Sequence, residues 1–371
     1  MNQATLELDT PPAAAATDRT GFDIGWDHAQ HGLVPPAELL HAGTPVCQGW
    51  MAGRAVLGRR VSGTHRTTRQ WLQLRLLAWR RGIAFDAKQV TPHHLAQIHA
   101  IRCPLLRQTL GGTAADPAAP VVDRIDPDAG YLAGNLVVLS QQAALARQSV
   151  GVLQAERNAR RSECHGETVD GLDAAAWWRL AVLRSYVTPL PFHQSARLPL
   201  ALLPPAGVRP QSGVQQLQAL VTLQFAAPGW SERTRAIAAT LPEHTLRHDF
   251  NLFVGALAPR VLEAGANPCD LHRTLEDAWL HERVQRRWQH FALSLGEAGV
   301  DALLAQATAK GVVLRPGPSG TQRRRACGSA STTALGLPMG RPSTTGFPFN
   351  VYERPRSTAT VSPRWLRTAT S

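Results

Sequence analysis

The chain has 371 residues and a formal net charge of +12, with 39 lysines and arginines against 27 aspartates and glutamates. Hydrophobic residues make up 44% of the sequence, which excludes a wholly disordered chain, and they form no stretch long enough to cross a bilayer. Five scattered cysteines without a CxxC pair argue against a disulfide scaffold and a structural zinc site, so we expect a protein of the reducing cytoplasm. Because no apolar stretch is long enough to span a bilayer, we expect no membrane partner.

The N-terminal part of the chain predicts little regular structure before its first helices. We expect residues 1–20, which are rich in Ala, Pro and Thr, to be disordered. We expect residues 21–64 to form an irregular arm, because prolines and glycines interrupt its short apolar stretches. Residues 65–82 and 91–102 then predict two helices from their composition and their terminal residues.

Residues 120–148 carry the sharpest local pattern in the sequence. The apolar runs at 120–126 and 134–140 have the composition of β-strands, and the Pro-Asp-Ala-Gly sequence at 127–130 is typical of a turn. The Ala-rich segment after the second run favours a helix. We therefore predict a hairpin followed by a helix.

Beyond a polar linker at 155–170, the chain predicts a helical domain over residues 171–312. Its clearest helix spans 270–296, where apolar residues recur at steps of four and three and form one stripe. The stripe consists of Leu280, Val284, Trp288, Phe291 and Leu295. Residues 313–371 form a basic tail that we expect to be disordered, because Gly, Ser, Thr, Pro and Arg dominate it.

Together these elements predict an α+β protein that is mostly helical, with a small hairpin–helix module over residues 65–155 and disordered termini. From Arg315 onward the tail holds nine arginines and one acid, so eight of the twelve net charges lie there. Such charge favours a weak, salt-sensitive attraction to nucleic acid and gives no sequence recognition.

The segment 120–148 contains Asp-Arg-Ile-Asp (123–126), a Gly-Tyr turn, a Gly-Asn strand start and an Ala-rich helix, in that order. It resembles the HNH, or ββα-metal, endonucleases, which hydrolyse phosphodiesters with one divalent cation, usually Mg²⁺, held between hairpin and helix. The resemblance implies that Asp123 binds the cation and that Asn135 holds the hairpin loop in place.

The sequence departs from the family pattern at several positions. Arg124 stands where the general-base histidine is expected; a guanidinium has no lone pair to accept a proton, although it can neutralise phosphate charge. Ala144 stands where the helix supplies an Asn or His ligand, and Ser140 and Ala143 stand where zinc-stabilised members carry cysteines. Under the resemblance, the alternative bases are Asp126, His93, His94 and His99.

The sequence leaves three functions open. The first is a metal-dependent DNA endonuclease with Asp123, Arg124, Asp126 and Asn135 in its site. The second is a non-catalytic, DNA-associated protein with a degenerate nuclease fold. The third is a helical protein-interaction protein without a nucleic-acid role, which the apolar stripe from Leu280 to Leu295 suggests. The alternative to the nuclease-like fold is a plain hairpin at 120–148 whose turn is capped by Asp126 and Asn135.

Arginines are the expected nucleic-acid contacts, because their guanidinium groups match phosphate geometry. On the helix at 65–82, four arginines fall within an arc of about 120°, a spacing that also suits the solvated face of a packed helix. The predicted contacts are Arg66, Arg69, Arg80 and Arg81 on this helix and Arg323, Arg324 and Arg325 in the tail. The oligomeric state stays open.

Overall fold

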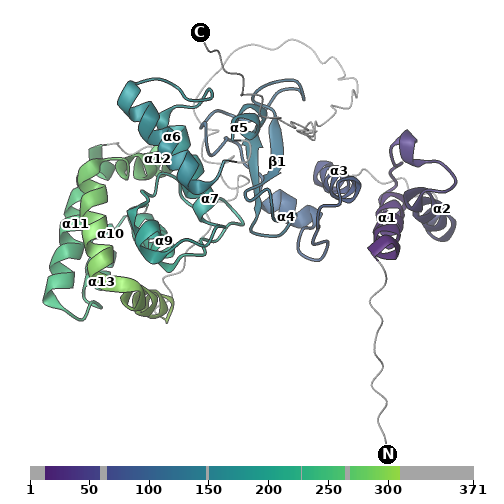
Figure 1. Cartoon of the computed structure of the whole chain (residues 1–371). Helices are drawn as coiled ribbons and strands as arrows, with labels where there is room; N and C mark the ends of the chain where they lie inside the picture. Colours follow the sequence, from purple (N-terminus) through teal and green to yellow (C-terminus); the bar gives the residue numbers. More distant parts are fainter. Residues whose placement is uncertain (1–12, 59–64, 148–149, 227, 264–267, 310–371) are drawn as a thin grey trace, which may run out of the picture.

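The computed structural model describes residues 13–58, 65–147, 150–226, 228–263 and 268–309. Over these residues the protein has thirteen α-helices, one short 3-10 helix and a two-stranded antiparallel sheet (Figure 1). The predicted α+β, mostly helical class is therefore confirmed. Residues 1–12 and 310–371 lie outside the described residues. The disorder predicted for 1–12 and 313–371 therefore stays a prediction. None of the described helices combines the length and the apolar character needed to span a membrane.

The N-terminal segment forms a pair of helices instead of an irregular arm. Helix α1 (Ala13–Gln30) packs against helix α2 (Pro45–Leu57), and a 3-10 helix (Ala37–Leu39) lies between them in the chain. The expectation of disorder at 13–20 is therefore wrong, and that of an irregular arm at 21–64 is wrong over residues 21–58, since residues 59–64 lie outside the described part of the chain.

The glycines of this helical pair explain the difference. Gly25 of α1 and Gly49 of α2 lie where the helices cross, and a Cβ atom on either residue would overlap backbone atoms of the other helix. Residues that weaken an isolated helix thus allow two helix backbones to approach closely. Thr44 caps α2 by accepting a hydrogen bond from the backbone amide of Cys47 at 3.2 Å.

Replacing Gly49 by alanine is expected to destabilise the α1–α2 pair by about 1–3 kcal/mol, because the added methyl group overlaps the carbonyl of Phe22. Urea unfolding followed by tryptophan fluorescence measures the loss, since Trp26 and Trp50 lie on these helices. Gly43→Ala is the matched control, because Gly43 is exposed and no atom lies within 4 Å of its added Cβ. Equal unfolding midpoints for the two variants would contradict the close crossing.

Residues 120–146 fold as the predicted hairpin followed by a helix. Strands β1 (Pro120–Arg124) and β2 (Leu136–Ser140) pair antiparallel, and α5 (Gln141–Ala146) follows β2 directly. Asp123 is paired with Val137 in the register, so their side chains lie on the same face of the hairpin. Because successive residues point to opposite faces, each strand presents side chains to two different layers.

Helices cover both faces of the hairpin (Figure 1). Helix α3 (Arg66–Arg80) matches its predicted range, and α4 (Pro92–Gln97) is shorter than predicted. Both helices pack on the face that carries Val122. The opposite face carries Val137, which belongs to the large core formed with α5 and the helices that follow.

Eight further helices follow the hairpin and α5. They are α6 (Val152–His165), α7 (Ala174–Ser185), α8 (Phe192–Arg197), α9 (Gly213–Gln224), α10 (Trp230–Ala238), α11 (His244–Glu263), α12 (Pro268–Ala278) and α13 (Glu282–Ala309). The predicted linker at 155–170 is wrong, because most of it lies in α6. The small residues Ala155 and Ala159 are fully buried and dock this polar helix on the core.

The predicted helix at 270–296 is in fact two helices. A turn at 279–281 separates α12 from α13. Trp279 in this turn is fully buried and donates a hydrogen bond from its indole to Oγ1 of Thr222 at 2.9 Å, so tertiary packing ends α12 where local propensity would continue it. The predicted end at 296 is confirmed, because the backbone of Gly296 is not helical (φ 69°, ψ 169°) and the range of α13 consists of two helical segments that meet at this kink.

The apolar stripe of α13 faces the interior of the protein. Trp288 and Phe291 are at most 1% exposed, and the Trp288 ring lies 5.2 Å from the ring of Phe253 on α11. One cluster of buried residues runs from Cys103, before the hairpin, to Ala307 in α13. The hairpin therefore shares its core with the C-terminal helices.

Candidate functional site at the hairpin–helix junction

The hairpin loop is held by the buried side chain of Asn135. Its Oδ1 accepts a hydrogen bond from the amide of Asp126 at 2.8 Å, and its Nδ2 donates to the carbonyls of Asp126 at 3.0 Å and Gly130 at 2.9 Å. All three bonds cross the loop and fix its path relative to β2. This is the role that the resemblance implies for Asn135, and it is also the role of a turn-capping residue in a plain hairpin.

Asn135→Ala is expected to lower the free energy of unfolding by about 2–3 kcal/mol, because it removes the three hydrogen bonds of the Asn135 side chain, which contribute about 1 kcal/mol each. Urea unfolding followed by circular dichroism measures the change. The control is Gln142→Ala on the exposed side of α5, which should stay within about 0.5 kcal/mol of the wild-type protein. If the two variants lose the same amount, other contacts hold the loop.

Arg124 and Asp126 are both engaged within the same loop. The Nη1 atom of Arg124 donates to two loop carbonyls, those of Pro127 at 2.5 Å and Ala129 at 2.7 Å. Oδ1 of Asp126 accepts a hydrogen bond from the amide of Asp128 at 3.0 Å, the pattern of an Asx turn. The geometry thus gives both side chains a role in shaping the turn.

Asp123 is bound by a fully buried arginine that follows α5. The Nη2 atom of Arg147 lies 2.5 Å and its Nε atom 3.0 Å from Oδ2 of Asp123. The same guanidinium donates to the carbonyls of Ile125 at 3.1 Å and Arg124 at 2.5 Å. The other carboxylate oxygen, Oδ1, accepts a hydrogen bond from the Arg124 amide at 2.8 Å. Arg147 thus ties the helix to the carboxylate and to the backbone of the hairpin.

Sequence reasoning missed Arg147, although a signal for it exists. Arg147 lies three residues after Ala144, so both positions share the face of the helix that turns toward β1. A long cationic side chain one helical turn beyond Ala144 can reach the carboxylate of Asp123.

The resemblance implies a divalent cation at Asp123, and the surrounding residues do not fit one. Both carboxylate oxygens accept hydrogen bonds, Ala144 offers no ligand atom, and the guanidinium of Arg147 would repel a cation in contact with Asp123. Within the described part of the chain, no group of three or more His, Cys, Asp or Glu side chains is placed to hold a metal ion. Arg147 supplies the positive charge that a cation would bring to Asp123.

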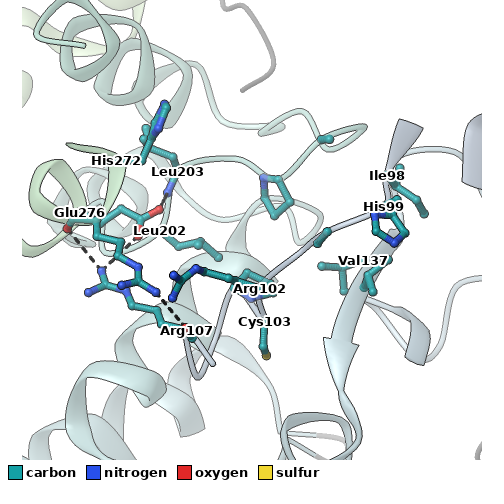
Figure 2. Close-up of a pocket in the computed structure, with 16 residues that line it drawn as sticks. Ile98, His99, Arg102, Cys103, Arg107, Val137, Leu202, Leu203, His272 and Glu276 are labelled. Atoms are coloured by element: carbon teal, nitrogen blue, oxygen red, sulfur yellow. Dashed lines mark hydrogen bonds and ion pairs between the residues drawn. The ribbon is translucent and has the colours of Figure 1, made fainter. Parts of the chain in front are cut away.

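The histidines considered as alternative bases have other surroundings. His93 is exposed, and His94 is half-buried, where burial lowers its pKa. His99 lines a cavity between the hairpin and the C-terminal helices (Figure 2). The carboxylate of Asp123 forms its ion pair with Arg147 and not with any of these histidines.

The predicted nucleic-acid arginines of α3 differ in their surroundings. Arg66 and Arg69 are exposed on the helix surface. Arg80 forms an ion pair with Glu38 at 2.6 Å, and Arg81 is half-buried after the last turn. The predicted contacts Arg323, Arg324 and Arg325 lie outside the described residues. On α3, Arg69 is therefore the better placed candidate, whereas Arg66 is exposed but also takes part in an interaction within the protein.

A cavity of about 260 Å³ lies between the hairpin and α12 (Figure 2). Its wall is formed by the segment before the hairpin, by β2, by the loop before α9 and by α12. The charged and titratable side chains of the wall, besides Cys103, are His99, Arg102, Arg107, His272, Arg273 and Glu276. Arg107 pairs with Glu276 and with Asp277, so Arg102 is the arginine of the wall that adds unpaired positive charge.

Glu276 of α12 is the buried carboxyl group of this wall. One of its oxygens lies 3.1 Å from Nη2 of Arg107, and the other accepts a hydrogen bond from the amide of Leu203 at 2.9 Å. Burial raises the pKa of Glu276 to about 7, although Arg107 and Arg179 act in the opposite direction. At neutral pH the carboxyl group is therefore only partly ionised.

Comparison of the chain with protein-family models, with curated proteins and with solved structures finds no match. The HNH-like interpretation of residues 120–148 therefore stays a prediction. The functional conclusion rests on the geometry and the charge of the molecule itself.

Proposed function

We propose that this protein binds nucleic acid through its phosphate backbone and does not cut it. Of the functions that the sequence leaves open, this is the non-catalytic, DNA-associated one. The observation that carries it is the ion pair between Asp123 and the fully buried Arg147, because this pair occupies the carboxylate that a catalytic cation would need.

The residues around this pair also favour a module without hydrolytic activity. Cleavage of a phosphodiester by the HNH route needs a base for the attacking water and a cation at the leaving oxygen. Arg124 cannot accept a proton, and its guanidinium donates a hydrogen bond to a loop carbonyl. The carboxylate of Asp126 accepts a hydrogen bond from the Asp128 amide within the turn. Ala144 brings no ligand to the site. What remains is a rigid hairpin backed by a helix.

The charge of the chain favours nucleic acid as the partner. The formal net charge is +12, and most of it lies in the arginine-rich tail. Arg66 and Arg69 add exposed guanidinium groups on α3, the helix that packs on the hairpin. Contacts of this kind position a protein on the phosphate backbone without reading the bases.

Plasmid DNA mixed with the pure full-length protein and Mg²⁺ or Mn²⁺ is expected to run as a retarded complex in a gel and to remain un-nicked. Binding should not require metal. Its affinity should fall at least about tenfold between roughly 50 and 200 mM salt, because several phosphate contacts release counterions. Fluorescence polarisation with a labelled duplex measures this dependence.

Two outcomes would overturn the proposal. Metal-dependent nicking that disappears in Asp123→Ala would show that the site is catalytic. The absence of binding at about 50 mM salt would remove nucleic acid as the partner. The double variant Arg66→Ala, Arg69→Ala is expected to weaken binding and to flatten its salt dependence.

The helical-interaction alternative loses the feature that suggested it. The stripe on α13 lies in the protein's own core, where Trp288 and Phe291 are packed against Phe253 and Phe250 of α11. It is therefore not an open docking surface, and the nucleic-acid proposal stands without it.

A further inference from the structure

We infer that the cavity between the hairpin and α12 is a binding site for a single phosphate group, with Arg102 as its principal ligand. This site is separate from the Asp123–Arg147 pair and does not require the function proposed above. The phosphate can belong to a nucleic-acid strand or to a small phosphorylated compound, because the same guanidinium chemistry recognises both.

The arginines of the cavity wall differ in whether a carboxylate balances their charge. Arg107 is matched by carboxylates, since it lies 3.1 Å from Glu276 and 2.7 Å from Asp277. Arg102 has no such match: its side chain is exposed and makes no hydrogen bond or ion pair with any residue that the structure describes. Figure 2 shows Arg102 extending toward the pair formed by Arg107 and Glu276. An unmatched cation beside a charged pair attracts an anion from solvent.

Glu276 is the carboxyl group of the wall that would repel a phosphate when it is ionised. Burial raises its pKa to about 7, so much of its negative charge is absent at neutral pH. The charge that remains is held by Arg107 and by the amide of Leu203. The positive charge of Arg102 is therefore not cancelled where the phosphate would enter.

The backbone at Arg107 holds Arg107 and Arg273 in place at the cavity. Arg107 adopts a left-handed conformation with a φ of 58°, which residues other than glycine rarely do, and its amide donates to the carbonyl of Cys103 at 2.7 Å. The carbonyl of Arg107 in turn accepts a hydrogen bond from Nη2 of Arg273 at 2.9 Å. Such strain persists only where the surrounding structure imposes it, often at ligand sites. The turn thus fixes two arginines around one opening.

The size of the cavity limits the ligand to one small group. Its volume of about 260 Å³ is below the roughly 300–1,000 Å³ of sites for drug-sized molecules. A duplex cannot enter it. A terminal phosphate, or one phosphate of a single strand, can.

Equilibrium dialysis of the full-length protein against radiolabelled inorganic phosphate at low salt tests the site. We expect saturable binding that Arg102→Ala weakens at least about tenfold, because a hydrogen bond between charged groups is lost. Arg102→Lys should recover part of the affinity. Arg209→Ala is the matched control, since Arg209 is also an exposed arginine and does not line the cavity.

A second arm measures a labelled single-stranded oligonucleotide with the same variants. If Arg102→Ala weakens both ligands, the phosphate comes from nucleic acid; if it weakens only inorganic phosphate, the natural ligand is a free phosphorylated compound. Equal phosphate binding by the wild-type protein and Arg102→Ala, or no saturable binding at all, overturns the inference. Intact phosphate binding without any DNA binding overturns only the proposed function.

Discussion

An Arg147→Ala variant is expected to be about 3–5 kcal/mol less stable than the wild-type protein. The substitution leaves the carboxylate of Asp123, whose side chain is only 22% exposed, without its cationic partner. It also removes the donors that satisfy the carbonyls of Arg124 and Ile125. A charge and two polar groups would then be desolvated without compensation. Urea unfolding at neutral pH, followed by circular dichroism, measures the loss.

Removing both partners of the ion pair separates the cost of the unpaired charge from the cost of lost packing. The double variant Asp123→Asn, Arg147→Met replaces the pair by neutral side chains of similar length and should be less destabilised than Arg147→Ala alone. Arg209→Ala, at an exposed position, is the control and should change stability by no more than about 0.5 kcal/mol. A loss below about 1 kcal/mol in Arg147→Ala would contradict the role given to this arginine.

In the non-catalytic module that we propose, Arg147 takes the place of the cation that the HNH resemblance implies. A guanidinium can neutralise Asp123 and join the strand to the helix, as a bound cation would. It is held by the chain, however, and has no exchangeable coordination position for a phosphate oxygen or a water molecule. Under the proposed function, the module would therefore keep its architecture without a means of hydrolysis, and stability and activity are the two properties of an Arg147 variant that test this.

The hairpin and its helix were predictable because their signals are local. The turn formers at 127–130, the apolar runs on either side and Ser140, which caps α5, lie within one short segment. Asn135 was predictable for the same reason, since it holds a loop formed by residues close to it in sequence. Long-range packing plays little part in these features.

The errors arose where distant residues decide the local structure. Gly49 indicated a turn by composition, yet it lies within α2, as Gly25 lies within α1, because each glycine leaves room for the backbone of the opposite helix. Trp279 follows a strong helical pattern, yet its burial ends α12. Arg147 was missed because its partner Asp123 lies 24 residues earlier in the chain. Each of these roles depends on a partner that lies far away in the sequence.

The buried carboxyl group of Glu276 couples stability to pH. In the unfolded chain a glutamate loses its proton near pH 4.5, whereas burial raises the pKa of folded Glu276 to about 7. Between these values the folded protein keeps a proton that the unfolded chain has released, so rising pH favours unfolding. The stabilising contribution of the protonated group is complete below about pH 4.5 and is lost as the pH rises through about 7.

Glu276→Gln is therefore expected to reduce the pH dependence of stability between about pH 4.5 and 7. A shift from 4.5 to about 7 corresponds to roughly 3 kcal/mol, which should appear as the difference between the wild-type and variant profiles of unfolding free energy. His28, His31 and His94, whose pKa values are lowered by burial, change stability in the opposite direction but are common to both proteins and cancel. Glu297→Gln, at an exposed position of α13, is the control and should leave the wild-type profile unchanged. Parallel profiles for the wild-type protein and Glu276→Gln would show that this carboxyl group is already ionised at the low end of the range.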